Sequence, residues 1–270
     1  MHVAFGSRVI VSVFNLVAAI GRVLLHSIAG FGRFSYFCMD VLRALGHPKS
    51  WLRRDRLGRQ LFEVGTLSIP VLAITGAFIG MTLAFEGYRQ FQAIGQEGRL
   101  GGVINVSIVK QLGPVLAGVM LAGRVGCSLT AALGSMRVTE QLDAMRAMAS
   151  DPVRVLVVPR VLACVLMIPI LTIFSNACGV IGGWVVVTKL YGADPAVYMR
   201  YSQQFVYGID IASGLIKSVF FGTAIALIAC YKGFNCKPGA EGVGAATTES
   251  FVTSFLAIIL QGVVLAKVLN

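Results

Sequence analysis

Five charged side chains stand inside long apolar stretches of this sequence, and they are the residues best placed to do chemistry. They are Glu63, Lys110, Arg124, Arg160 and Lys217. A charge within a membrane-spanning segment is costly and is therefore a functional hypothesis by default. Glu63, Arg124 and Arg160 fall toward one end of their stretches, where reaching the membrane surface or local pairing explains them. Lys110 and Lys217 fall toward the other end, where they either reach lipid headgroups or face a cavity that receives an anionic group.

Enzyme motifs are absent from the sequence. It has no GxxxxGK[ST] loop for ATP, no HExxH zinc motif and no GxSxG nucleophile motif. The three histidines are isolated near the N-terminus, and the six cysteines form no CxxC pair, so no metal site is expected. The apolar stretches hold no histidine and no pair of aspartates for intramembrane proteolysis. We expect no catalytic residue, no metal and no cofactor in this chain.

Composition indicates that a membrane surrounds these charges. Hydrophobic residues make up 56% of the 270 residues and charged residues 13%, with a mean hydropathy of +0.80. A soluble domain carries about 25% charged residues, and a helix needs about 20 apolar residues to cross the hydrocarbon. The alternation of a membrane β-barrel is absent. The sequence predicts an all-α polytopic membrane protein with five transmembrane helices, at 61–85, 103–133, 155–188, 211–231 and 248–268.

The net charge of +11 follows from this topology, and we expect no nucleic acid partner. Most Lys and Arg outside the spans lie in the N-terminal region and in the 134–154 and 232–247 loops, which share one side of the membrane. The positive-inside rule places that side in the cytoplasm. An odd number of spans then puts the N-terminus in the cytoplasm and the C-terminus on the outer side.

The N-terminal region differs from the rest of the chain. Residues 8–46 are apolar but interrupted by charges and rich in aromatics, a pattern typical of a helix that lies in the membrane interface. A signal peptide is the alternative, because Arg8 precedes an apolar run. We predict an N-terminal interfacial region, 1–57, and a membrane domain, 58–270.

Small residues and turn signals add two further expectations. Gly76-x-x-x-Gly80 lets two helices approach closely, either as ordinary packing or at a dimer contact or gate.

Asp194-Pro195 is a helix start signal on the outer side, and it predicts a short amphipathic helix over 194–207.

The segment 136–150 interrupts the membrane pattern between spans two and three. Thr139 is expected to cap a helix, with Glu140 and Asp143 in its early turns favouring the helix dipole. Leu142 and Met145 lie on one apolar face at helical spacing. The pattern fits either a helix lying in the membrane interface or a docking element for a cytosolic motor.

Three segments of the sequence resemble the MlaE-type lipid permeases, also called YrbE or Mce permeases. They are GAFIGMTLAFEGY, IKSVFFG and the long GPVLAGVMLAGRVGCSLTAALGSMRVTEQLDAMRAMASDPVRVLVVPRVLA. The resemblance covers roughly residues 58–268. It implies a homodimer in the bacterial inner membrane, with a cytosolic ABC ATPase that binds ATP and Mg, and a periplasmic MCE-domain protein. The implied activity moves phospholipid between the inner membrane and the periplasm and maintains outer-membrane lipid asymmetry.

The resemblance also implies site residues. The helix at about 137–149 corresponds to the coupling helix that docks on the ATPase, with candidate contacts at Arg137, Glu140, Gln141, Asp143 and Met145. The candidate lipid contacts are Leu83, Phe85, Phe91, Lys110, Gln111, Leu112 and Lys217. The family often has an Arg-Glu pair where this chain has Lys110-Gln111. We expect the lost carboxylate to leave Lys110 freer to meet a lipid phosphate.

Two other functions are compatible with a polytopic membrane protein. An ion-coupled transporter would need acidic residues at mid-membrane, and none is evident. A membrane scaffold would only anchor an MCE protein, without moving lipid itself.

Overall fold

The computed structural model describes residues 21, 28–46 and 54–269. The chain separates into two compact units, Met1–Gly46 and His47–Asn270. In the first unit, residues 28–45 form a helix that exposes Phe31, Tyr36 and Leu42 and buries Val41. A helix that lies in the membrane interface presents apolar side chains of this kind to lipid, and the interfacial position of this region stays a prediction. The apolar run considered as a signal peptide lies outside the described residues.

The second unit is helical throughout its described part, apart from short connections. The first long stretch consists of α3 (Arg54–Val64), η1 (Thr66–Ser68) and α4 (Ile69–Ala93). The second consists of η2 (Glu97–Arg99), α5 (Leu100–Ser107), η3 (Ile108–Leu112), α6 (Gly113–Leu121), η4 (Ala122–Gly126) and α7 (Cys127–Val138). The third consists of η5 (Val153–Val157), α9 (Val158–Val185) and η6 (Val186–Leu190). The last two are α11 (Gly208–Phe234) and α12 (Ala240–Leu269).

Five helical stretches among the described residues are long and apolar enough to cross a membrane. They are Leu57–Ala93, Glu97–Val138, Val153–Leu190, Gly208–Phe234 and Ala240–Leu269. The prediction of an all-α polytopic membrane protein with five spans is confirmed, and every span extends beyond its predicted limits. The predicted domain boundary after residue 57 falls within α3.

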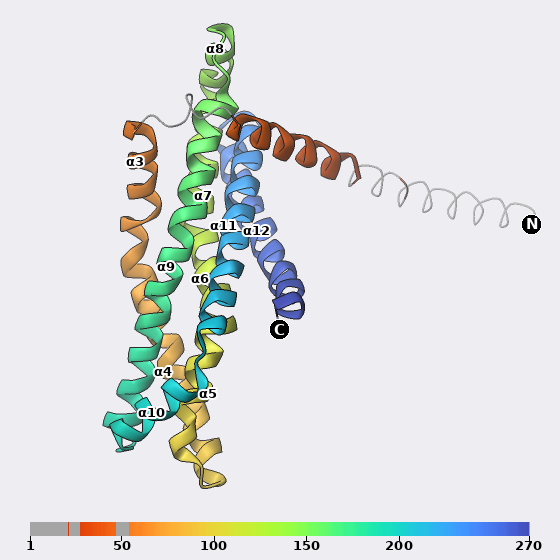
Figure 1. Ribbon diagram of the computed structural model, residues 1–270. Coiled ribbons are helices and arrows are strands. Elements are labelled where there is room, and N and C mark those ends of the chain that lie inside the picture. The colour runs from red at the N-terminus through yellow and green to blue at the C-terminus, as the bar shows by residue number, and fades with distance from the viewer. Residues whose placement is uncertain (1–20, 22–27, 47–53, 270) are drawn as a thin grey trace, which may run out of the picture. The chain divides into compact units, whose positions relative to one another are not determined.

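Two short helices mark opposite ends of the bundle. Figure 1 shows α8 (Gln141–Ala147) at one end and α10 (Pro195–Phe205) at the other, beside α5. We call these the α8 end and the α10 end. The predicted helix after Asp194 is confirmed as α10, because the Asp194 carboxylate accepts a hydrogen bond from the backbone N–H of Ala196 at 2.8 Å. Pro195 supplies a fixed φ at the first helical position.

Helices α4 and α9 pack together along the bundle with little space between their backbones. A methyl group added at Gly76 would overlap the carbonyl of Ser175, and one added at Gly80 would overlap the carbonyl of Gly179. The Gly76-x-x-x-Gly80 motif therefore serves helix packing within this chain. Membrane helices can approach each other this closely where small residues face each other.

Four short segments in spans two and three are π-helical rather than α-helical: η3, η4, η5 and η6. A π turn holds one more residue per turn than an α turn and often marks a functional position. Each of the four carries one basic residue, namely Lys110, Arg124, Arg154 and Lys189. Charges thus coincide with local widening of the helix.

Candidate functional site

Two lysines, a glutamine and an aspartate form a polar cluster between η3 and α11. The ammonium of Lys217 donates to the Gln111 side-chain Oε1 at 2.6 Å and to the backbone carbonyl of Lys110 at 2.9 Å. The ammonium of Lys110 lies 3.2 Å from a carboxylate oxygen of Asp210. Lys217 is 0% exposed, whereas the Lys110 side chain is 31% exposed. Lys110 is therefore the cation of this cluster that reaches the molecular surface.

Pro114 explains why a backbone carbonyl is available to Lys217. In an α-helix the carbonyl of Lys110 would accept from the N–H four residues later, and that residue is Pro114, which has no N–H. The chain widens into η3 immediately before this proline. A buried carbonyl without a partner costs free energy, and the Lys217 ammonium provides the missing hydrogen bond. Gly214 allows the approach, since a methyl group there would overlap the Val109 carbonyl.

Asp210 is the residue of this cluster that sequence reasoning missed. The expected limits of span four, 211–231, leave Asp210 just outside the span, but α11 begins at Gly208 and Asp210 is only 7% exposed. Its carboxylate also accepts from the backbone N–H of Tyr207 at 3.1 Å. The expectation that Lys110 is freed by the loss of a carboxylate at Gln111 is wrong, because Asp210 pairs with Lys110. Its position two helical turns before Lys217, on the same face of the helix, was the available signal.

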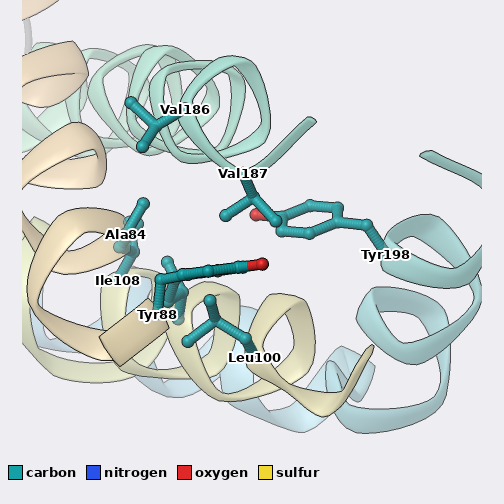
Figure 2. Close-up of a cluster of buried hydrophobic side chains, with 8 residues drawn as sticks. Ala84, Tyr88, Leu100, Ile108, Val186, Val187 and Tyr198 are labelled. Atoms are coloured by element: carbon teal, nitrogen blue, oxygen red, sulfur yellow. The ribbon is translucent and has the colours of Figure 1, made fainter. Parts of the chain in front are cut away.

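The apolar candidate residues lie in and around a cluster at the α10 end. Figure 2 shows side chains of this cluster, among them Ala84, Tyr88, Leu100 and Ile108. They come from α4, α5, η3, η6 and α10. Leu83 and Phe91 are partly buried and pack against this cluster. Phe85 is 42% exposed, with its ring edge-on to Tyr191. Leu112 is half-buried in η3 beside the polar cluster.

A hydrogen-bonded chain fixes α10 against α5 at this end. The hydroxyl of Tyr198 donates to Asn105 Oδ1 at 3.3 Å, and Asn105 Nδ2 donates to the Ser202 hydroxyl at 2.7 Å. Burial raises the pKa of the Tyr198 phenol to about 12, although its bond to Asn105 acts in the opposite direction. The phenol therefore keeps its proton and its donor role. Leu83 and Phe91 therefore pack against a buried cluster in which hydrogen bonds hold α10 to α5. Lys110, Gln111 and Lys217 are brought together in the polar cluster between η3 and α11.

At the other end, α8 is shorter than predicted and is capped differently. Thr139 ends α7, and its hydroxyl donates back to the Ser135 carbonyl at 2.9 Å. The predicted N-cap role of Thr139 is therefore wrong. Glu140 precedes α8 in the left-handed region, with φ of 59°. This conformation turns the chain sharply, so that α8 becomes a separate helix of seven residues.

One buried leucine and three charges hold α8 in place. Leu142 is 1% exposed and anchors the helix, while Met145 is half-buried. Asp143 accepts from Arg137 at 2.9 Å and from Arg146 at 3.1 Å. The remaining candidate contacts, Glu140 and Gln141, are exposed, as is Met148 at 72%. The structure therefore separates residues that brace α8 from residues that its surface offers to a partner.

Comparison with known proteins identifies the family. The family model described as Permease MlaE matches residues 57–268. The chain belongs to the MlaE permease family. It is therefore a permease subunit of the ABC transporter type, a non-catalytic component. Within the described part of this MlaE permease, no three His, Cys, Asp or Glu side chains are grouped so as to hold a metal ion.

The relatives carry related names. A probable ABC transporter permease protein of Rickettsia conorii is 36% identical, over 94% of this chain and 97% of that protein. The Haemophilus influenzae intermembrane phospholipid transport system permease protein MlaE is 34% identical, over 91% of this chain and 94% of its own length. The chloroplastic protein TRIGALACTOSYLDIACYLGLYCEROL 1 of Arabidopsis thaliana is also 34% identical, over 84% of this chain and 64% of that protein.

Proposed function

We propose that this MlaE permease moves phospholipid between the bacterial inner membrane and a periplasmic MCE-domain protein. It acts as a homodimer driven by a cytosolic ABC ATPase, which binds ATP and Mg, and its transport maintains outer-membrane lipid asymmetry. The N-terminus and the α8 end face the cytoplasm, and the α10 end faces the periplasm. The near full-length match to the Haemophilus influenzae phospholipid transport permease supports this substrate.

One structural observation carries the proposal: a single helical stretch, Glu97–Val138, connects the polar cluster to α8. Lys110 and Gln111 stand near its α10 end, and α8 follows directly after its other end. A force applied to α8 is transmitted along this stretch to the residues that would contact lipid. Such an arrangement lets nucleotide bound elsewhere bias two states of the lipid site.

The lipid site has the two kinds of surface that a phospholipid requires. Acyl chains need an apolar wall, and the headgroup needs polar partners at its rim. Leu83, Phe85, Phe91 and Leu112 supply apolar surface at the α10 end. Lys110 is partly exposed and would reach the phosphate while it remains paired with Asp210, whereas Lys217 and Gln111 hold η3 in the shape that presents Lys110.

Reconstitution with purified partners tests this function. Vesicles that contain the permease, the ATPase and the MCE protein should transfer labelled phospholipid only when ATP is present. Glu140→Lys combined with Met148→Ala removes exposed α8 contacts without touching the Asp143 ion pairs, and it should abolish transfer and ATPase binding. Arg200→Ala, an exposed change on α10, is the matched control. Full transfer by the α8 double variant would contradict the docking role.

The same assay separates the alternatives. Lipid movement that follows a proton gradient without ATPase would indicate an ion-coupled transporter. Asp210 is the acidic side chain that such a mechanism would use, but its carboxylate already forms an ion pair with the Lys110 ammonium. A scaffold that only anchors the MCE protein would leave transfer unchanged when the outer ends of spans one and two are cross-linked.

A further inference from the structure

A cavity with polar and apolar lining lies in the half of the bundle nearer to α8, away from the lysine cluster. It has a volume of about 550 Å³ and is enclosed by α3, η1, η4 and α7. Its apolar wall consists of Val64, Leu67, Val125 and Leu129. Its polar lining consists of Gln60, Glu63, Arg124 and Ser128. A cavity with both kinds of lining is suited to an amphipathic ligand.

Arg124 is the cation of this cavity, and it has unused hydrogen-bonding capacity. It is half-buried in η4, and its Nη1 donates to the Ser68 hydroxyl at 2.5 Å. Ser68 is fully buried and itself donates to the Val64 carbonyl at 2.6 Å, so the guanidinium is held from behind. No carboxylate lies within ion-pair distance of Arg124 among the described residues. A guanidinium has five N–H donors, and most of these remain open to an anion.

The acceptors of the cavity lie nearer to its water-facing end. Glu63 is on α3, and its carboxylate receives hydrogen bonds from Arg59 at 3.0 Å and Gln60 at 3.3 Å. The Arg59 side chain is 80% exposed, and such a surface pair contributes only about 0–1 kcal/mol, so a ligand can replace it. Gln60 Oε1 is buried and accepts no hydrogen bond within the described chain. Glu63 and Gln60 thus offer two acceptors to a cationic group.

The order of these groups matches the order of charges in a zwitterionic phospholipid. Arg124 lies deep in span two, whereas Glu63 and Gln60 lie in the first turns of span one. In a lipid with an ethanolamine headgroup, the phosphate is nearer to the acyl chains and the primary ammonium is nearer to water. We propose that the cavity binds such a headgroup in the leaflet at the α8 end, with Arg124 on the phosphate and Glu63 and Gln60 on the ammonium.

The proposed site lies at the end of the bundle opposite to Lys110, so it would hold lipid of the other leaflet. The inference rests on the proposed transport function in one respect: it treats the bound lipid as transported substrate that enters or leaves the permease through this cavity. Leu67 gives a local probe, because it lines the cavity and is 52% exposed. A photoreactive p-benzoylphenylalanine at Leu67 in the full-length chain reports lipid in this cavity and not at the α10 end.

The experiment measures cross-linking of this probe in vesicles, without ATPase. Vesicles are made with phosphatidylethanolamine, phosphatidylcholine or phosphatidylglycerol as the guest lipid in a common host. Phosphatidylethanolamine should cross-link best, because phosphatidylcholine lacks ammonium N–H groups and phosphatidylglycerol lacks the cation. Loss of one charge-assisted contact should reduce capture about tenfold. Glu63→Gln should remove the preference for ethanolamine, and Arg124→Gln should reduce capture of all three lipids.

Matched variants keep the result interpretable. Arg59→Gln, which removes the exposed partner of Glu63, and Arg200→Gln, which changes an exposed cation on α10, should leave capture intact. Arg124→Lys should restore much of the capture, which separates the effect of charge from an effect on folding. Glu63→Gln changes an exposed side chain whose surface pair with Arg59 contributes only about 0–1 kcal/mol. Equal capture of the three lipids, full competition by inorganic phosphate, or cross-linking to a second copy of the chain would each overturn the proposal. The capture experiment needs no ATPase, so its result does not depend on transport. Intact capture together with failed ATP-driven transfer in the reconstituted system would count against the proposed function alone.

Discussion

The Lys217 ammonium lies 2.9 Å from the backbone carbonyl of Lys110, on a different helix, and donates a hydrogen bond to it. This side chain replaces the backbone N–H that Pro114 lacks. A buried cation thus serves the main chain of a neighbouring helix, and the shape of η3 depends on it.

Replacing Lys217 should destabilise the fold in a way that depends on Pro114. Lys217→Met leaves the Lys110 carbonyl and Gln111 Oε1 without their partner, at a cost of about 1–3 kcal/mol per buried acceptor. Pro114→Ala supplies a backbone N–H to that carbonyl, so Lys217→Met should cost less in the Pro114→Ala background. Thermal unfolding of the four proteins in detergent measures this coupling. Lys267→Met, at an exposed site, is the control, and additive effects of the two substitutions would refute the link.

The carboxylate of Asp210 should be exchangeable for one at position 111. Asp210→Asn leaves Lys110 without its counter-charge and should cost about 1–3 kcal/mol, because one partner of the pair is buried and the other partly exposed. Gln111→Glu places a carboxylate beside Lys217, and in the Asp210→Asn background it should recover part of the lost stability. Melting temperatures of the two single variants and the double variant test this. A double variant no more stable than Asp210→Asn would show that the two positions are independent.

Gly80 should tolerate no side chain. Gly80→Ala forces α4 away from the Gly179 backbone, and overpacking of this kind costs about 1–3 kcal/mol or more. Gly244→Ala is the matched control, since that helical glycine has open space around it. It should be neutral or stabilising by about 0.5–1 kcal/mol. Fluorescence-detected size exclusion after heating would compare the two, and equal melting temperatures would contradict the packing argument.

Leu142 should anchor α8 without supporting the rest of the bundle. Leu142→Ala removes the buried contact of a seven-residue helix, and buried Leu→Ala changes cost about 2–5 kcal/mol. Because this loss is confined to α8, ATPase-driven transfer should fall strongly while the melting temperature of the bundle changes little. Transfer and melting are measured on the same preparation. A large fall in melting temperature would mean that α8 supports the whole fold.

The sequence predicted the parts of this structure that depend on composition and period. All five spans and α10 follow from hydropathy and from the Asp194-Pro195 start signal. It could not predict Asp210 as the partner of Lys110, since that pair joins helices about one hundred residues apart in the chain. It also missed the π turns, because spans two and three are apolar on most sides of the helix, so a shift of one residue does not show in the pattern. The expected N-cap role of Thr139 is wrong because Thr139 lies between the end of α7 and the start of α8. Its hydroxyl could bond to either helix, and it donates to the Ser135 carbonyl of α7.

The π turns also determine where this chain can change length. Each holds one residue more than an α turn, so deleting one residue within η3 or η4 would leave a continuous α-helix. The helices on both sides would keep their present faces toward α9 and α11. A deletion within α4 or α11 would instead rotate everything beyond it by about 100° and turn its buried face outward. Aligned relatives should therefore place single-residue gaps at η3, η4, η5 and η6, and leave the regular helices uninterrupted.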